Sequence, residues 1–340
     1  MTASKVLVIG DGSWGTALAL ALAHNGVDTT MWSAFPEQAA ELQANRENKR
    51  YLPGVPLPEN LGVSADPAEA CDGADLVVSV VPTQYLRLVA QRFEEFLPMG
   101  LPIVSATKGL EIETMKSPTA ILLEVLGARD IGVLTGPSHA EEVARGLPAS
   151  VVVGSESASL AELTQQAFTG KRLRVYTSSD RVGAELGGAL KNVIALAAGV
   201  SDGLELGDNA KAALLTRGMV EMARYGQRHG AKPSTFFGLA GFGDLVTTAC
   251  SQHSRNRAVG ERIGRGETLS EVLDSMQMVA EGVWTTKALF GPESEVSADT
   301  PMPIAEEVHA ILFEGKPPAK AVEDLMTRAP TSEMDDLFGG

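Results

Sequence analysis

The sequence lacks the features that mark secreted, metal-bound or membrane-spanning proteins. Its 340 residues include two cysteines, Cys71 and Cys250, too few for a disulfide framework and without CxxC spacing for a metal. The longest apolar run, residues 17–23, is too short to cross a bilayer, and the N-terminus has no signal-peptide hydrophobic core. We therefore expect a cytoplasmic protein with no membrane insertion and no metal site.

Positive charge is scarce as well. The chain has 28 Lys and Arg residues against 43 Asp and Glu residues, which gives a formal net charge of −15. Such a surface repels polyphosphate over most of its area, and this argues against a nucleic-acid partner. A small anion can still bind, because a pocket is governed by the few charges that line it.

What the sequence does contain is a two-part pattern, as its length suggests. In the first half, short β-branched runs alternate with helical stretches, which is typical of a parallel sheet covered on both faces. We expect α/β structure here, in a doubly wound sheet. The expected strands cover residues 5–9, 28–32, 76–81, 103–106, 131–134, 150–153 and 173–176.

Strand-like runs stop after about Asp180, and Ala, Leu, Met, Gly and paired charges dominate the rest. This composition favours an all-helical second domain. We place the first domain at residues 1–185 and the second at 186–328. Residues 329–340 are acidic and rich in turn-forming residues, so we expect a frayed tail.

One glycine motif predicts a dinucleotide site. The segment Gly10-Asp11-Gly12-Ser13-Trp14-Gly15 fits GxGxxG and lies between an expected strand and an expected helix. The first Gly permits the tight turn, the second lets the backbone approach a pyrophosphate, and the third lets helix and strand pack closely. Amides at the helix N-terminus then hold the phosphate. The first domain is therefore interpreted as Rossmann-type.

The end of the second expected strand bears on the choice of cofactor. NAD-specific sites usually place Asp or Glu there to bind the ribose 2′-OH. Residues 32–36 instead read Trp-Ser-Ala-Phe-Pro, and the nearest arginine in sequence is Arg46. We therefore expect NADP(H) to be preferred and NAD(H) to be possible. The alternative that this loop contacts neither base nor ribose stays open.

Polar residues at other strand ends and in the helical half are candidates for substrate binding. Lys108 follows one strand, and Lys191 lies among small apolar residues in the segment 187–192. Arg255 and Asn256 offer planar donors suited to phosphate oxygens. Lys191 could instead extend its ammonium to solvent, and for Arg257 we favour a solvated helix face.

Taken together, these motifs resemble NAD(P)-dependent glycerol-3-phosphate dehydrogenases of the bacterial type. The match runs in order from Val6 to about Phe313. It comprises GxGxxG, Ala-Thr-Lys-Gly-Leu at 106–110, Gly-Pro-Ser at 136–138, Leu-Gly-Gly-Ala-Leu-Lys-Asn at 186–192, Gly-Phe-Gly-Asp-Leu at 241–245 and Ser-Arg-Asn at 254–256.

The resemblance implies a reaction and a set of roles. The enzyme would interconvert dihydroxyacetone phosphate and sn-glycerol 3-phosphate for glycerophospholipid synthesis, with Lys191 as catalytic acid/base. Substrate contacts would come from Lys108, Gly136, Ser138, Lys191, Asp244, Ser254, Arg255 and Asn256. Cofactor contacts would come from Gly10, Gly12, Ser13, Trp14, Gly15, Ala34, Lys108, Ala140, Arg255, Val279 and Glu281. His139 is interpreted as structural.

Elementary chemistry supports these roles. Hydride delivery to a ketone leaves negative charge on oxygen, which an ammonium such as Lys191 can stabilise and protonate. Asp244 could orient that ammonium, and Lys108 could add a second positive charge. Two alternatives remain: a two-domain dehydrogenase acting on a hydroxy acid, and a catalytically silent dinucleotide sensor. The apolar helical domain and the resemblance together predict a homodimer.

Overall fold

The computed structural model describes residues 3–276, 278–297, 300–330 and 333. It divides into two units: residues up to Thr107 with Pro118–Arg181, and Lys108–Ser117 with the residues from Val182 onward. The boundary expected after residue 185 lies within helix α8 (Arg181–Gly203), whose residues from Val182 onward belong to the second unit. We did not predict that residues 108–117 belong to the helical unit. Apart from residues 329–330 and 333, the predicted frayed tail lies outside the described residues.

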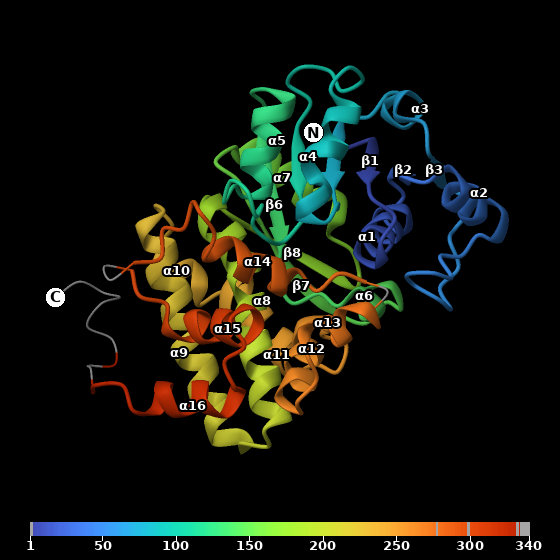
Figure 1. Cartoon of the computed structure of the whole chain (residues 1–340). Coiled ribbons are helices and arrows are strands. Elements are labelled where there is room, and N and C mark those ends of the chain that lie inside the picture. The colour runs from blue at the N-terminus through green and yellow to red at the C-terminus, as the bar shows by residue number, and fades with distance from the viewer. Residues whose placement is uncertain (1–2, 277, 298–299, 331–332, 334–340) are drawn as a thin grey trace. The chain divides into compact units, whose positions relative to one another are not determined.

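The first unit contains one eight-stranded sheet in the order β3-β2-β1-β4-β5-β6-β7-β8 (Figure 1). All neighbouring strands are parallel except β6 and β7. The strands are β1 (Lys5–Ile9), β2 (Asp28–Trp32), β3 (Leu61–Ser64), β4 (Leu76–Ser79), β5 (Ile103–Ser105), β6 (Ile131–Thr135), β7 (Ala149–Gly154) and β8 (Leu173–Ser178). The predicted doubly wound sheet is confirmed. Strand β3 was missed because it is four residues long and contains a glycine.

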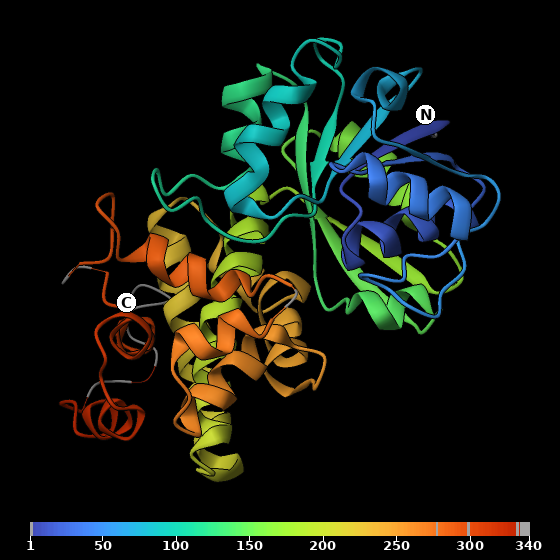
Figure 2. The same cartoon turned by 45° about the vertical axis from the view of Figure 1, so that its right-hand side comes forward.

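Both faces of this sheet are buried, as its continuous apolar strands require. In β1, Val6 and Val8 belong to one hydrophobic core and Leu7 and Ile9 to another. Helices α1, α2, α6 and α7 contribute to the first core, and α3, α4 and α5 to the second (Figures 1 and 2). Their bounds are α1 (Ser13–His24), α2 (Pro36–Asn45), α3 (Pro67–Cys71), α4 (Thr83–Phe93), α5 (Pro118–Leu126), α6 (Ala140–Ala144) and α7 (Ala158–Phe168).

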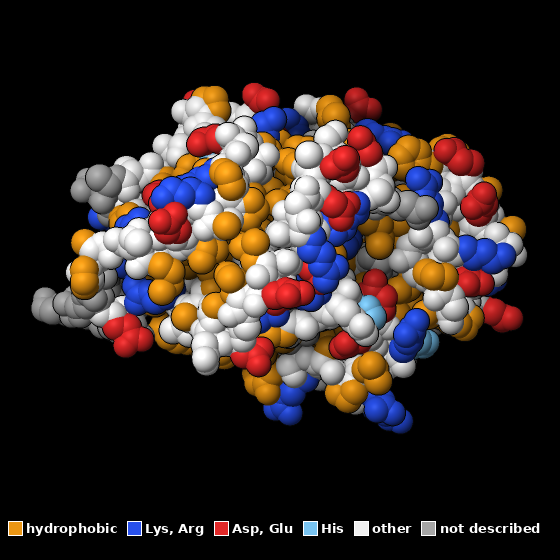
Figure 3. All heavy atoms as spheres, turned by 60° about the horizontal axis from the view of Figure 1, so that its bottom comes forward, with side chains coloured by type: hydrophobic (Ala, Val, Ile, Leu, Met, Phe, Trp, Pro, Cys, Tyr) orange, Lys and Arg blue, Asp and Glu red, His pale blue; other side chains and the backbone are white. Residues whose placement is uncertain are grey.

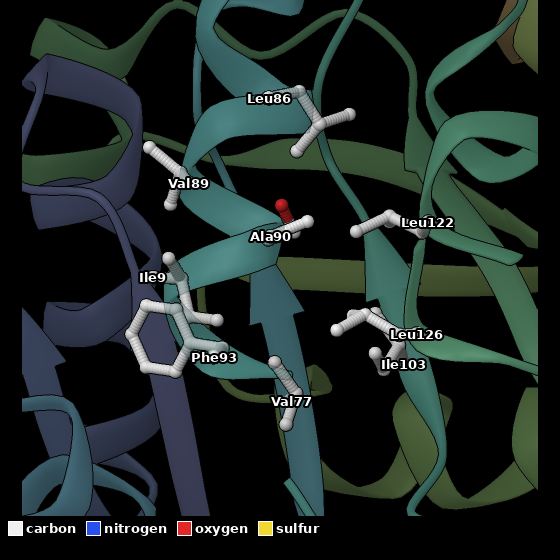
Figure 4. Close-up of a pocket in the computed structure, with 10 residues that line it drawn as sticks. Ile9, Val77, Leu86, Val89, Ala90, Phe93, Ile103, Leu122 and Leu126 are labelled. Atoms are coloured by element: carbon white, nitrogen blue, oxygen red, sulfur yellow. The ribbon is translucent and has the colours of Figure 1, made fainter. Parts of the chain in front are cut away.

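A small interior space lies in the second of these cores. Figure 4 shows Phe93 and Leu86 of α4 and Leu122 of α5 directed toward Val77 and Ile103 of the sheet. The lining is apolar except for one serine on β4. Because it offers almost no polar group to orient a ligand, this space is a feature of core packing and not a candidate substrate site.

The second unit is helical, as predicted. Its hydrophobic core surrounds α8. Helix α12 packs closely against α8, because a Cβ at Gly260 of α12 would lie only 2.0 Å from the carbonyl oxygen of Leu196 in α8. The other elements are α9 (Gly207–Arg228), α10 (Pro233–Phe236), the π-helical segment η1 (Leu239–Gly243), α11 (Asp244–Cys250), α12 (Arg255–Gly264), α13 (Leu269–Asp274), α14 (Glu281–Leu289), α15 (Pro303–Phe313) and α16 (Pro318–Met326). Within the described ranges, none of the helices combines the length and apolar character that crossing a bilayer requires.

Candidate functional site

The glycine turn between β1 and α1 has the geometry of an anion cradle. Gly10 has φ +122°, and a Cβ at Gly15 would lie 2.1 Å from the Gly10 carbonyl oxygen, so neither position accepts a side chain. Gly12 is the N-cap of α1 and provides no side-chain cap. A Cβ at Gly12 would meet no atom within 4 Å. There is therefore open space beside Gly12 at the N-terminus of α1, where the helix dipole favours a phosphate.

The first residues of α1 also fit a bound dinucleotide. Ser13 opens the helix and is buried. The indole Nε1 of Trp14 is buried and has no hydrogen-bond partner in the part of the chain that the structure describes. A buried donor without a partner costs about 1–3 kcal/mol, which a ligand acceptor would recover. These features suit an NAD(P) cofactor at this turn.

Two alanine substitutions separate the roles of the glycines. We expect Gly15→Ala to lower Tm by about 5 °C or more, because its Cβ would overlap the Gly10 carbonyl oxygen. Gly12→Ala should shift Tm by less than about 2 °C but weaken NADPH binding about tenfold or more, since its methyl group enters the phosphate space. Thermal melts and fluorescence titration with NADPH measure both effects. Unchanged NADPH binding in Gly12→Ala would contradict this assignment.

The other predicted ligand contacts of the first unit lie after its strands. Ala34 follows β2 and is half-buried. Gly136 follows β6 with φ +133°, and its carbonyl oxygen accepts a hydrogen bond from Ser138 Oγ at 2.9 Å. Ala140 is the first residue of α6, and His139 is its N-cap. The structural interpretation of His139 stays a prediction.

In the second unit, three predicted residues form one charged cluster. Asp244 lies at the start of α11, directly after η1, and both its oxygens are engaged. Its Oδ1 lies 3.0 Å from Lys191 Nζ, and its Oδ2 lies 2.6 Å from Lys108 Nζ. The side chains of Asp244 and Lys191 are 3% and 7% exposed, and that of Lys108 is 19% exposed. One carboxylate thus bridges two ammonium groups, and with all three ionised the cluster carries one net positive charge.

Burial and the charges within the cluster together shift the pKa values of its members. It lowers the pKa of Lys191 to about 8; the charges of Lys108 and Arg255 act in the same direction, while Asp244 opposes them. Burial alone would raise the pKa of Asp244, but the charges and hydrogen bonds of Lys108 and Lys191 outweigh it and hold that pKa below its ordinary value. Figure 3 shows basic and acidic side chains interspersed on the face it draws. This face therefore shows no extended region of a single charge.

The structure adds a residue that the sequence did not single out. Thr248 lies one turn after Asp244 on α11, and its Oγ1 accepts a hydrogen bond from Lys191 Nζ at 2.5 Å. The i,i+4 spacing from Asp244 is the one signal that could have pointed to it. Lys191 therefore has two fixed oxygen partners and does not extend to solvent.

Asn256 joins three helices of the second unit. Its Nδ2 donates to Asn192 Oδ1 of α8, and its Oδ1 accepts from the backbone N–H of Gly282 in α14, both at 2.9 Å. Asn256 itself belongs to α12 and is buried. An amide nitrogen carries two hydrogens, so at most one N–H remains for a phosphate. Asn192, beside Lys191, was not among the predicted site residues.

The remaining predicted residues of the second unit lie near helix starts. Ser254 caps α12 and accepts a hydrogen bond from the backbone N–H of Arg257 at 3.2 Å. Arg255 is exposed and close enough to affect the pKa of Lys191. Val279 is half-buried, and Glu281 is the first residue of α14.

One expectation needs correction. We predicted a solvated helix face for Arg257, but its side chain is only 19% exposed. It forms ion pairs with Asp202 at 2.7 Å and with Glu261 at 3.1 Å. The pair with Asp202 joins α12 to α8, and the pair with Glu261 lies within α12, so Arg257 is not a solvated side chain. Within the described ranges, no group of three His, Cys, Asp or Glu side chains is arranged to hold a metal.

Comparison with known families identifies the family to which the chain belongs. The model described as NAD-dependent glycerol-3-phosphate dehydrogenase N-terminus matches residues 5–161, and the corresponding C-terminus model matches residues 180–323. The chain belongs to the NAD-dependent glycerol-3-phosphate dehydrogenase family. The second match begins at residue 180, close to Val182, where the helical unit resumes.

Similar proteins from this family align over nearly the whole chain. The glycerol-3-phosphate dehydrogenase [NAD(P)+] of Geobacillus thermodenitrificans is 49% identical over 337 residues, covering 98% of each chain. That of Moorella thermoacetica is 48% identical over 331 residues, covering 97% of this chain and 98% of its own. The crystal structure of glycerol-3-phosphate dehydrogenase from Coxiella burnetii matches with a TM-score of 0.91 and 37% identity, over 96% of this chain and 99% of that one. The family resemblance inferred from the motifs is confirmed.

Proposed function

We propose that this family member reduces dihydroxyacetone phosphate to sn-glycerol 3-phosphate for glycerophospholipid synthesis, and that it prefers NADPH while accepting NADH. The observation that carries the assignment of roles is the buried Lys191–Asp244–Lys108 cluster. Similarity to the curated glycerol-3-phosphate dehydrogenases [NAD(P)+] supports the reaction and the cofactor class.

Lys191 is suited to act on the carbonyl oxygen of the substrate. When bound, the reduced nicotinamide supplies the hydride, and negative charge then develops on that oxygen. The Lys191 ammonium, held by Asp244 and Thr248, stabilises this charge and donates the proton that completes the alcohol. In the reverse direction neutral Lys191 accepts that proton.

The other cations bind and orient the substrate. Lys108 places a second ammonium on the far oxygen of Asp244, and Arg255 adds a planar guanidinium at the start of α12. A phosphate tail held by Arg255 and the remaining N–H of Asn256 would fix the carbonyl relative to Lys191. Gly136, Ser138 and Ser254 supply further polar contacts to the substrate in this proposal.

A direct assay tests the function. Purified protein with NADPH and dihydroxyacetone phosphate should consume reduced nicotinamide, followed by absorbance near about 340 nm. Turnover on a hydroxy acid and not on the triose phosphate would overturn the substrate assignment. Tight NADPH binding without turnover on either substrate would indicate a sensor.

The lowered pKa of Lys191 predicts opposite pH dependences for the two directions. Reduction requires the ammonium, so kcat/KM for dihydroxyacetone phosphate should fall as pH rises through about 8. Oxidation of glycerol 3-phosphate requires the neutral amine, so its kcat/KM should rise through the same pH. Initial rates from pH 6 to about pH 10 in both directions measure this. Parallel profiles in the two directions would contradict the acid/base role.

Two properties of the whole protein complete the proposal. We expect a homodimer located in the cytoplasm, as inferred from the composition of the helical domain and from the family resemblance. Light scattering coupled to size exclusion would measure the mass in solution, and a monomer at micromolar concentration would overturn the dimer.

A further inference from the structure

The residues after β2 leave the source of NADPH preference unexplained. In this fold the ribose 2′ position lies near the carboxyl end of the second strand. Here that end carries Ser33, Ala34 and Phe35, none of which can hold a phosphate by charge. Arg46, the nearest arginine in sequence, donates from its Nη2 to the carbonyl oxygens of Pro58 and Leu61. Arg46 therefore holds in place the segment that leads into β3, and it is already engaged by these two carbonyl groups.

The structure brings a different cation to this strand end. Arg92, at the end of α4, lies 58 residues from Ala34 in sequence, yet its Nη1 approaches the Ala34 carbonyl oxygen at 3.5 Å. The guanidinium carbon lies 4.8 Å from the centroid of the Trp32 ring. Arg92 is exposed, and no carboxylate is paired with it in the part of the chain that is described.

The support beneath Arg92 is rigid. Trp32 is 1% exposed, its Nε1 donates to the Ala65 carbonyl oxygen at 3.0 Å, and Phe93 meets its ring edge-on at 4.9 Å. A guanidinium stacked on an indole face loses little freedom on binding, because the ring already restricts it. The Arg92 guanidinium has five N–H donors, and its long contact with the Ala34 carbonyl oxygen uses one of them. Other N–H donors of this group can therefore bind a ligand.

The acid that is hydrogen-bonded to this strand end, Asp11, does not oppose an anion here. Asp11 is 8% exposed, and its Oδ2 accepts a hydrogen bond from Ser33 Oγ at 2.8 Å. Burial raises its pKa, which disfavours the charged form. Its carboxyl group is thus held by Ser33 and shielded from solvent.

We propose that Arg92, stacked on Trp32 beside Ala34, binds the 2′-phosphate of NADP(H) and determines the preference for NADPH over NADH. The guanidinium fork matches phosphate oxygens, and it lies at the strand end where this fold places the ribose. This inference rests on the proposed function, whose cofactor is NAD(P). It assigns a role to a residue that neither the motifs nor the family resemblance indicated.

Arg92→Gln provides the test, with NADPH and NADH compared in the reduction of dihydroxyacetone phosphate. We expect kcat/KM for NADPH to fall about 10- to 100-fold, with kcat/KM for NADH changed less than about twofold. Inhibition by 2′,5′-ADP should weaken in parallel, while inhibition by 5′-ADP should not. Arg92→Lys keeps the charge and should recover part of the NADPH preference.

Two further variants sharpen this test. Arg87→Gln removes a guanidinium on the same helix that pairs with Glu124 at 3.2 Å, and it should leave the NADPH/NADH ratio unchanged. Arg50 lies over the Tyr51 ring and acts electrostatically on Asp11. A loss of NADPH preference in Arg50→Gln and not in Arg92→Gln would overturn the assignment, as would an equal loss for both cofactors in Arg92→Gln. Failure of the wild-type protein with both cofactors would instead refute the proposed function.

Discussion

Replacing Lys191 with alanine should reduce kcat for dihydroxyacetone phosphate reduction by about 10³-fold or more, with NADPH affinity unchanged within about twofold. The reason is that the ammonium both stabilises the developing oxyanion and donates the proton. Neither the Asp244 carboxylate nor the Thr248 hydroxyl that hold it can replace a positive charge. Single-turnover kinetics and NADPH titration measure the two quantities separately.

The fold should tolerate this change, because Asp244 keeps its ion pair with Lys108 when Lys191 is removed. Lys191→Met preserves side-chain volume without charge and should show the same loss. Lys211→Ala is the matched control, since Lys211 of α9 pairs with Asp202 and should leave kcat unchanged. A near-normal kcat in Lys191→Met would remove Lys191 from the acid/base role.

The second large effect is expected from Asp244→Asn. Without the carboxylate, the two ammonium groups of Lys191 and Lys108 lose the negative charge that holds them together. The pKa of Lys191 should then fall further below its ordinary value, because burial and the Lys108 charge are no longer opposed. We expect kcat/KM for reduction to fall about 10²-fold at pH 7.5, and the midpoint of its pH profile to move to lower pH.

Stability should change in the same variant. Removing one partner from a buried ion pair costs about 3–5 kcal/mol, so Tm should fall markedly. In the wild-type protein, the lowered pKa of Asp244 contributes stability above the carboxyl's unfolded pKa, and this contribution is lost as pH falls through the folded pKa. Asp202→Asn is the control, because Asp202 pairs with Lys211 and Arg257 away from the cluster.

A second variant keeps the Asp244 prediction testable if the protein does not fold. Thr248→Val removes only the hydroxyl that accepts from Lys191, and it should lower kcat while retaining the ion pairs. An Asp244→Asn profile with the wild-type midpoint would show that this carboxylate does not set the protonation of Lys191.

Local features of the fold were predictable from the sequence. The segment from β1 through the glycine turn into α1 is determined by neighbouring residues: a β-branched run, glycines that alone accept the required geometry, and an apolar helix. The helical character of the second unit follows from composition in the same way. Strand β3 was not predicted because a four-residue segment with a glycine carries no clear local strand signal. The antiparallel pairing of β6 and β7 was not predictable either, because it depends on how the chain returns to the sheet.

The order of the motifs along the chain predicted the family without any coordinates, because each motif is a short run of neighbouring residues, and the family comparisons confirmed it. Their contacts are a different matter. Lys108 and Asp244 are 136 residues apart, and Arg92 and Ala34 are 58 apart. No local preference specifies such pairs, since they form only when helices and strands pack. The sequence by itself determined the glycine turn, the two-part organisation and the candidate residues for the reaction. Tertiary packing decided that one buried carboxylate joins two lysines and that a helix end brings a guanidinium to β2, because these contacts form only between distant segments.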